Sequence, residues 1–181
     1  QSAANIVRPF PTACIFHDDI EGGLTEYRKE VLTNMHGDEL AQKYISRNTG
    51  ITAENFYERL KMIHDLKINN ISDYEYDTGC CDIHGEKIYK LIPTVYILDS
   101  VALLMPEKFT EEEELSGSMS ATAAAKTNSM SFKRIIPMLK AANIILLMIN
   151  HINKKIDINP MQRTKSQVSY LKQDESLPGG N

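Results

Sequence analysis

Two runs of consecutive apolar residues dominate the pattern of this chain. Residues 95–98 are all apolar or aromatic and lead directly into Asp99-Ser100. Residues 144–149 are all apolar and lead into Asn150-His151. A continuous run of this length is typical of a strand that is buried on both faces of a parallel sheet. We therefore predict two fully buried parallel strands, each followed by polar side chains at its carboxyl end.

Shorter segments predict the strands around these two. Residues 12–17 form a short apolar run, and residues 44–46 have the composition of a further short strand. Residues 74–91 contain two segments that alternate between apolar and polar positions, with glycines between them. Alternation interrupted by turn residues predicts a hairpin or an ordered loop, inserted before the strand at 95–98.

Helical spacing of apolar residues appears in the segments between the strands. Residues 25–35 and 52–68 both show it, and each segment starts with a threonine that can cap a helix. Residues 1–7 have the composition of the end of a helix, and residues 121–142 predict another helix. Proline disrupts helical hydrogen bonding, so Pro137 is expected to kink this last helix or to start a second piece.

The order of these elements indicates the fold class. Strands that alternate with helices form βαβ units, which build a parallel sheet. We therefore predict an α/β fold with a mostly parallel central sheet flanked by helices, and one domain that covers residues 1–181. Residues 152–181 are polar and poorly periodic, which favours a long loop.

Composition limits the binding partners and the cellular compartment that fit this fold. A chain of 181 residues can bury a real core, and its net charge of −4 leaves no general basic field, so nucleic-acid binding needs a local patch. Three cysteines do not form a secreted disulfide framework and favour a reducing interior. Cys80 and Cys81 are adjacent and lie near His84, but this spacing does not fit a zinc finger. The longest apolar run is too short to cross a membrane.

Carboxylates at the predicted strand ends are the first candidates for chemistry. Asp99 is expected at the carboxyl edge of the sheet, where open α/β sheets bind ligands and where a carboxylate can hold Mg²⁺ through water. The alternative is a loop aspartate with no ligand. Asp18, Asp19 and Glu21 form an acidic turn in which any of the three could activate a water molecule, although such a turn can also be merely solvated.

The order of these motifs carries a family resemblance. A strand leads into an acidic turn at 16–23, a strand ends in Asp-Ser at 96–100, a strand ends in Asn-His at 149–151, and Gly-Gly-Asn follows at 179–181. This arrangement resembles the ATPase core of RecA-like recombinases, which are P-loop NTPases, and especially those of bacteriophages. Residues 125–137 resemble a helix of the same phage proteins, so the resemblance spans nearly the whole chain.

The resemblance implies roles for five residues. Asp99 resembles the Walker B acid that holds Mg²⁺, and Ser100 is its hydroxyl neighbour. Glu21 resembles the glutamate that activates the attacking water. His151, assisted by Asn150, resembles the residue that senses the γ-phosphate of ATP. The implied cofactors are ATP and Mg²⁺.

The resemblance also implies contacts with DNA. Residues 152–181 resemble the second DNA-binding loop of the family, in which basic side chains neutralise phosphates and an aromatic ring stacks on a base. A solvated loop can be equally rich in lysine, and the glutamates at 111–114 would repel phosphates. The DNA-binding candidates are Lys126, Lys154, Lys155, Arg163, Lys165, Tyr170 and Lys172.

The function implied by the family is ATP-dependent DNA recombination. Such a protein forms a filament on single-stranded DNA and pairs it with a homologous duplex, in the cytoplasm of a bacterial host. The family's Gly-rich phosphate loop, expected before the first helix, is absent from this sequence. The chain therefore resembles an internal segment with both ends cut, and we expect it to be inactive alone. A fragment of a RecA-core replicative helicase and a non-catalytic binding module are the alternatives.

Overall fold

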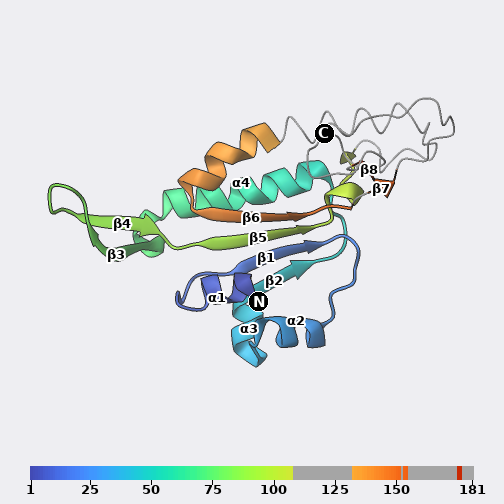
Figure 1. Ribbon diagram of the computed structural model, residues 1–181, viewed down its shortest axis with the longest axis horizontal. Helices are drawn as coiled ribbons and strands as arrows, with labels where there is room; N and C mark the ends of the chain where they lie inside the picture. Colours follow the sequence, from blue (N-terminus) through green and yellow to red (C-terminus); the bar gives the residue numbers. More distant parts are fainter. Residues whose placement is uncertain (108–131, 152, 155–174, 177–181) are drawn as a thin grey trace.

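A four-stranded parallel sheet forms the centre of the computed structural model, which describes residues 1–107, 132–151, 153–154 and 175–176 (Figure 1). Its strand order is β2-β1-β5-β6, and each neighbouring pair is parallel. The predicted α/β class and parallel sheet are confirmed. The four strands are β1 (Ile15–Asp19), β2 (Tyr44–Arg47), β5 (Thr94–Asp99) and β6 (Ile144–Ile149).

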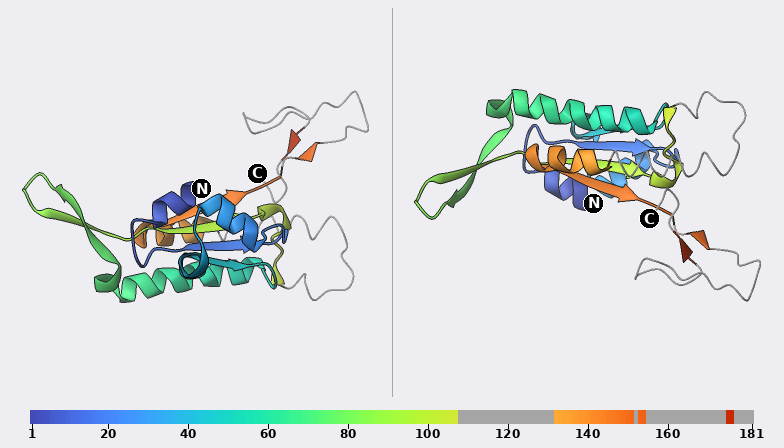
Figure 2. Two further views of the ribbon diagram at one scale, coloured as in Figure 1. Left: turned by 90° about the horizontal axis from the view of Figure 1, so that it is seen from below. Right: turned by 90° about the horizontal axis from the view of Figure 1, so that it is seen from above.

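Helices cover both faces of the sheet, so the molecule has three layers (Figure 2). On one face lie α4 (Ala53–Asn69) and a helix at residues 132–141, whose side chains share one apolar cluster with β5 and β6. On the other face, α1 (Ser2–Val7) and α3 (Gly37–Lys43) contribute to a second apolar cluster. The helix α2 (Glu26–Thr33) contacts α1 on the same side.

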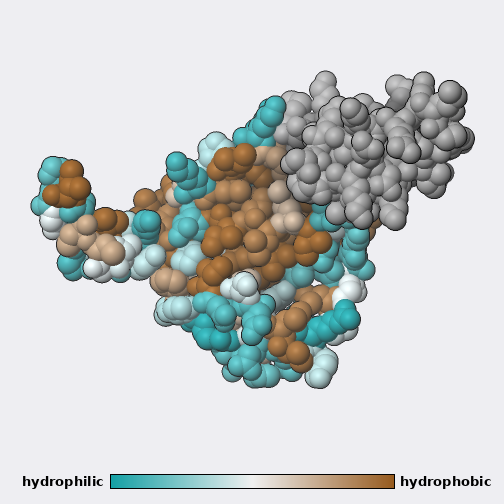
Figure 3. Space-filling model, in the orientation of Figure 1, coloured by the Kyte–Doolittle hydropathy of each residue, from teal (hydrophilic) through white to brown (hydrophobic). Residues whose placement is uncertain are grey.

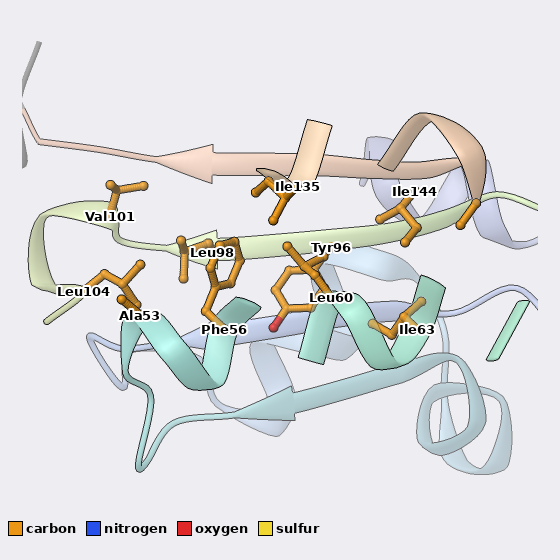
Figure 4. Close-up of a cluster of buried hydrophobic side chains, with 11 residues drawn as sticks. Ala53, Phe56, Leu60, Ile63, Tyr96, Leu98, Val101, Leu104, Ile135 and Ile144 are labelled. Atoms are coloured by element: carbon orange, nitrogen blue, oxygen red, sulfur yellow. The ribbon is translucent and has the colours of Figure 1, made fainter. Parts of the chain in front are cut away.

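The first cluster covers one face of β5. Phe56 and Leu60 of α4 point toward Tyr96 and Leu98 of β5 (Figure 4). The rings of Phe56 and Tyr96 meet edge to face, with centroids 5.5 Å apart. Full burial of one such side chain contributes about 1.5–3 kcal/mol. This cluster is therefore a main source of stability for the central strand.

The second cluster occupies the opposite face of the same strand. Val95 of β5 and Ile15 of β1 pack there against Ala4 and Val7 of α1. Because successive strand residues point to opposite faces, Val95 and Tyr96 belong to different clusters. The two-sided burial predicted from the apolar run at 95–98 is confirmed for this strand.

The strand β6 has the same kind of sequence but a different environment. It lies at the edge of the four-stranded sheet, and Leu147, Met148 and Ile149 are 41%, 46% and 46% exposed. The prediction of a strand at 144–149 is confirmed, but the prediction of full burial is wrong for its carboxyl half within the described part of the chain. In the orientation of Figure 1, the space-filling view in Figure 3 shows apolar residues gathered over the middle of the molecule.

Both predicted threonine caps are present. The Thr25 hydroxyl accepts a hydrogen bond from the Arg28 amide at 3.3 Å, and the Thr52 hydroxyl accepts one from the Asn55 amide at 3.1 Å. These bonds satisfy amides that have no partner inside the helix. Two short helices, α3 and α5 (Ile71–Tyr74), were not predicted, because seven and four residues leave too little apolar periodicity to detect.

The inserted hairpin near 74–91 is confirmed. β3 (Glu75–Cys81) and β4 (Lys87–Leu91) pair antiparallel and project away from the sheet (Figure 1). No helix in the described part of the chain is long and apolar enough to cross a membrane.

Three details differ from the sequence predictions. β1 runs from Ile15 to Asp19 rather than over 12–17, so the first acidic residues belong to the strand and not to a turn. The helix at 132–141 continues through Pro137 without a break, and its predicted beginning at residue 121 lies outside the described residues. The predicted loop at 152–181 contains two short paired strands, β7 (Asn153–Lys154) and β8 (Glu175–Ser176).

Candidate functional site

Polar side chains from three neighbouring strands meet at the carboxyl edge of the sheet. Asp99 ends β5, His151 follows the end of β6, and Glu21 lies in the turn after β1. Asp99 is in register with Asp19 of β1 on one side and with Ile149 of β6 on the other. Because all three strands are parallel, their polar ends share one edge, which is where such sheets bind ligands.

The turn after β1 and the end of β6 are joined by a side-chain contact. The Nε2 atom of His151 lies 2.5 Å from Oε1 of Glu21, although 130 positions separate the two residues. This hydrogen bond is the main reason why the pKa of Glu21 is lowered. Asn150 supports the same corner, because its side-chain oxygen accepts a hydrogen bond from the His151 amide at 3.0 Å. The structure thus brings Glu21, Asn150 and His151 together.

Asp99 lies in a crowded negative environment. Burial raises the pKa of its carboxyl group, and the negative charges of Glu21 and Asp19 raise it further. A cation beside Asp99 would offset this repulsion. Ser100 is fully buried, and within the described ranges its hydroxyl makes no hydrogen bond, although it lies near enough to Glu21 to favour the charged form of that carboxylate. The Asp99-Ser100 peptide bond is cis.

Asp19 fixes the shape of the turn that carries Glu21. Its two carboxylate oxygens accept hydrogen bonds from the amides of Gly23, at 3.3 Å, and Leu24, at 2.8 Å. Gly22 has a φ of +66°, in the left-handed region that glycine adopts without strain. The chain therefore turns sharply after β1 and holds Glu21 at its tip.

Asp18 points to the opposite face of β1 and has a structural environment. Its buried carboxylate accepts hydrogen bonds from Arg59 at 2.5 Å, from Arg47 at 3.2 and 3.3 Å, and from the Tyr96 hydroxyl. The sequence left open which of the three acids could activate water. The structure gives them different environments, because Asp18 is held in an ion cluster, Asp19 holds the turn, and Glu21 contacts the end of β6.

A cavity of about 470 Å³ opens beside this edge, between the sheet and α2. One wall is acidic and includes Asp19, Glu21 and Asp99, whereas the α2 wall is mainly apolar and includes Val31 and Leu32. The cavity gives the acidic edge a space in which a ligand can be enclosed.

The cavity wall also includes His17, which sequence reasoning missed. Its Nδ1 atom lies 2.7 Å from the hydroxyl of Tyr44, while its Nε2 atom is buried and has no hydrogen-bond partner in the described structure. The available signal was the spacing of His17 and Asp19, since residues two apart in a strand share one face.

The residues at this edge fit a magnesium ion held through water. Among the described residues, no three His, Cys, Asp or Glu side chains converge closely enough to ligate a metal ion directly. Mg²⁺ usually keeps several of its waters and takes only one or two carboxylates. The orphan polar atoms of His17, which lines the same cavity as Asp99, and of Ser100, which follows Asp99 in the chain, are groups that such waters could satisfy. Cys80 and Cys81 are exposed free thiols on the hairpin.

Most of the predicted DNA contacts lie outside the described residues. The side chain of Lys154 is also not described, although its backbone forms part of β7. β7 starts two residues after His151. The predicted contacts outside the described residues are Lys126, Lys155, Arg163, Lys165, Tyr170 and Lys172.

Comparison with known proteins adds no relative. No protein-family model matches this sequence, and no curated protein matches it significantly.

Proposed function

We propose that this chain is part of an ATP-dependent DNA recombinase. The intact protein binds single-stranded DNA as a filament and promotes homologous pairing and strand exchange with duplex DNA. The proposal combines the resemblance of the ordered motifs to phage RecA-like proteins with the site at the carboxyl edge of the sheet.

The observation that carries the proposal is the contact between Glu21 and His151 beside Asp99. In a nucleotide hydrolase, Asp99 holds Mg²⁺ through water and Glu21 positions the attacking water. Magnesium neutralises charge that develops on the phosphates. His151 contacts Glu21 and directly precedes the segment proposed to bind DNA. A change at the phosphates can therefore reach that segment through one side chain.

The charge of residues 152–181 supports a DNA partner. This segment contains five basic residues against three acidic ones, whereas the whole chain has a net charge of −4. A local basic excess is what binding to phosphates requires in an acidic protein. In a filament, repetition of the segment along one strand multiplies this weak local attraction.

Binding of the chain to labelled oligo(dT), measured by fluorescence anisotropy across a salt series, tests the DNA partner. We expect single-stranded DNA to bind more tightly than a duplex of equal length. Replacement of both Lys154 and Lys155 by alanine should weaken binding and reduce the salt slope by roughly 1.4, since each phosphate contact on a single strand contributes about 0.7.

The matched control replaces two exposed lysines away from the site, Lys61 and Lys90, by alanine. Equal losses in both double variants would mean that only net charge matters, and the proposed DNA segment would be rejected. Absence of any binding to oligo(dT) would reject the DNA partner itself. The non-catalytic binding module would be favoured by a different result. In a version of the protein that also contains a phosphate loop, DNA binding would be tight but would not change when ATP is added.

A further inference from the structure

His17 occupies a special position relative to the two aspartates of the edge. It precedes Asp19 by two residues in β1, so both side chains lie on the same face of the sheet. Asp19 is in register with Asp99 of β5, and neighbouring strands are about 4.8 Å apart. His17 and both carboxylates line the same cavity. The three side chains therefore surround one corner of it.

The hydrogen bonding of the His17 side chain is incomplete. The side chain is 7% exposed, and Nδ1 is occupied by the Tyr44 hydroxyl at 2.7 Å. Nε2 is buried without a hydrogen-bond partner in the part of the chain that the structure describes. A buried polar atom without a hydrogen bond is unfavourable, because it has lost its bonds to water. A group that bonds to Nε2 would remove this penalty.

The chemistry of the corner restricts what that group can be. The charges of Asp19 and Asp99 act on His17, and Glu21 lies on the same cavity wall. An anion would be repelled by three carboxylates, whereas a hydrated cation is attracted. Water in the shell of a bound cation directs its hydrogens outward, so it needs an acceptor. A neutral imidazole that donates from Nδ1 to the Tyr44 oxygen presents a lone pair at Nε2.

We infer that His17 is a positioning residue of a divalent-cation site, in which Nε2 accepts a hydrogen bond from a water molecule that also coordinates a cation held at Asp99 and Asp19. This inference rests on the proposed function, because it takes Asp99 as the residue that holds the cation. It adds a residue that neither the motifs nor the family resemblance assign. Tyr44 completes the arrangement, since its hydroxyl lies 2.7 Å from Nδ1 and holds the ring in place.

Manganese binding to the chain provides the first test. Mn²⁺ replaces Mg²⁺ as the probe, because free Mn²⁺ is counted directly by electron paramagnetic resonance. We expect His17→Phe, which keeps the ring shape without its nitrogens, to weaken Mn²⁺ binding by about 10-fold, as is usual for residues that orient a metal's ligands. His17→Gln retains an acceptor and should recover most of the affinity. His64→Phe, on α4, is the matched control and should leave the affinity unchanged.

A spectroscopic signature separates positioning from a merely structural role. In a long-range ¹H–¹⁵N correlation spectrum, His17 should carry its hydrogen on Nδ1, and addition of Mg²⁺ should shift the Nε2 resonance. The same addition should have no effect on Nε2 in the Asp99→Asn variant. A hydrogen on Nε2 would overturn the inference, because that atom could not accept a bond from metal-bound water.

The outcomes distinguish a failure of this inference from a failure of the proposed function on which it rests. If Asp99→Asn abolishes Mn²⁺ binding while His17→Phe binds like the wild type, His17 has no part in the site and the inference fails alone. If Asp99→Asn leaves Mn²⁺ binding unchanged, Asp99 does not hold the cation, and the proposed function fails together with the inference. Circular dichroism of each folded variant shows whether a lost affinity merely reflects unfolding.

Discussion

The two faces of β1 carry acidic residues with opposite environments. On one face, Asp18 is fully buried and its charge is balanced by Arg47 and Arg59. On the other face and at the strand's end, Asp19 and Glu21 share an edge with Asp99. One short acidic segment therefore contributes both to an ion cluster that is complete within the chain and to a group of carboxylates that repel one another.

The difference shows how a strand separates stability from binding. Successive residues of a strand point to opposite faces, so a single position decides which environment a carboxylate enters. A buried carboxylate whose partners are in place stabilises the fold only as long as none of them is removed. Carboxylates that raise the pKa of Asp99 gain stability when a cation arrives. A cation at this edge would therefore relieve a repulsion that the ion cluster of Asp18 does not have.

The largest expected effect falls on catalysis at the edge. In a version of the protein that also contains a Gly-rich phosphate loop, Glu21→Gln should slow ATP hydrolysis by about 10²–10⁴-fold, because the amide cannot take up a proton from water. Nucleotide binding should stay close to that of the unaltered protein. Steady-state hydrolysis and equilibrium binding of a fluorescent ATP analogue measure the two effects.

The neighbouring aspartate is the control for this assignment. Asp19→Asn keeps an oxygen that can accept a bond in the turn, so it should lower hydrolysis much less than Glu21→Gln. If Asp19→Asn stops hydrolysis and Glu21→Gln does not, the assignment of the water-activating residue is wrong by two positions.

For the buried Asp18 on one face of β1, we predict that substitution lowers stability. Asp18→Ala leaves two arginines facing a buried site without a carboxylate, and we expect the free energy of unfolding to fall by about 3–5 kcal/mol. Urea unfolding followed by circular dichroism measures the change. Asp99→Asn, at the edge, removes a charge that lies among like charges and should cost little or no stability. Similar losses in both variants would show that the two sides of the strand do not differ as described.

Lys67 sharpens the comparison because it is a buried charge that has no ion-pair partner among the described residues. It is 1% exposed, and its Nζ atom donates to the Ile92 carbonyl at 2.6 Å and to Thr94 Oγ1 at 3.2 Å. Burial lowers the pKa of Lys67 to about 8. Between pH 8 and the unfolded pKa near 10.4, the unfolded chain binds more protons, so stability rises with pH in this window.

The expected gain from this single group is on the order of 2 kcal/mol. It is measured as the change, between pH 7.5 and pH 10, in the difference in unfolding free energy between a protein that retains Lys67 and the same protein with Lys67→Met. Both proteins carry Cys14→Ala, because burial raises the pKa of that thiol and its titration acts in the opposite direction. A difference that stays constant with pH would contradict the lowered pKa of Lys67.

The fold was largely predictable where local patterns have a single physical meaning. Thr52 capped its predicted helix, and the glycine-separated alternating segments formed the hairpin β3–β4. The apolar runs predicted two strands but could not distinguish their environments. Tyr96 is buried and Leu147 is 41% exposed. An apolar run indicates that a strand can be buried, but it does not show which neighbouring elements cover the strand.

The site was predictable where residues directly follow a strand. Asp99 was chosen for that reason, whereas Glu21 and His151 were chosen from the resemblance, and the structure places all three at one edge. The ion cluster of Asp18 was not predictable, because Arg59 lies 41 positions away on a helix and nothing local marks it as a partner. His17 was missed although its spacing from Asp19 places both residues on one face, because the strand that brings Asp99 beside Asp19 lies far away in the sequence.

The smallest expected effect concerns communication between the edge and DNA. His151 contacts Glu21 and directly precedes the basic segment, so it can bias that segment between two arrangements. In a version of the protein with a phosphate loop, His151→Ala should reduce the increase in single-stranded DNA affinity that ATP produces by several-fold, and should reduce ATP binding less. Lys154→Ala combined with Lys155→Ala should instead lower DNA affinity equally with and without nucleotide. The measurement is DNA affinity with and without a non-hydrolysable ATP analogue. If the ratio of these two affinities is unchanged in His151→Ala, the residue is an ordinary histidine at the end of a strand.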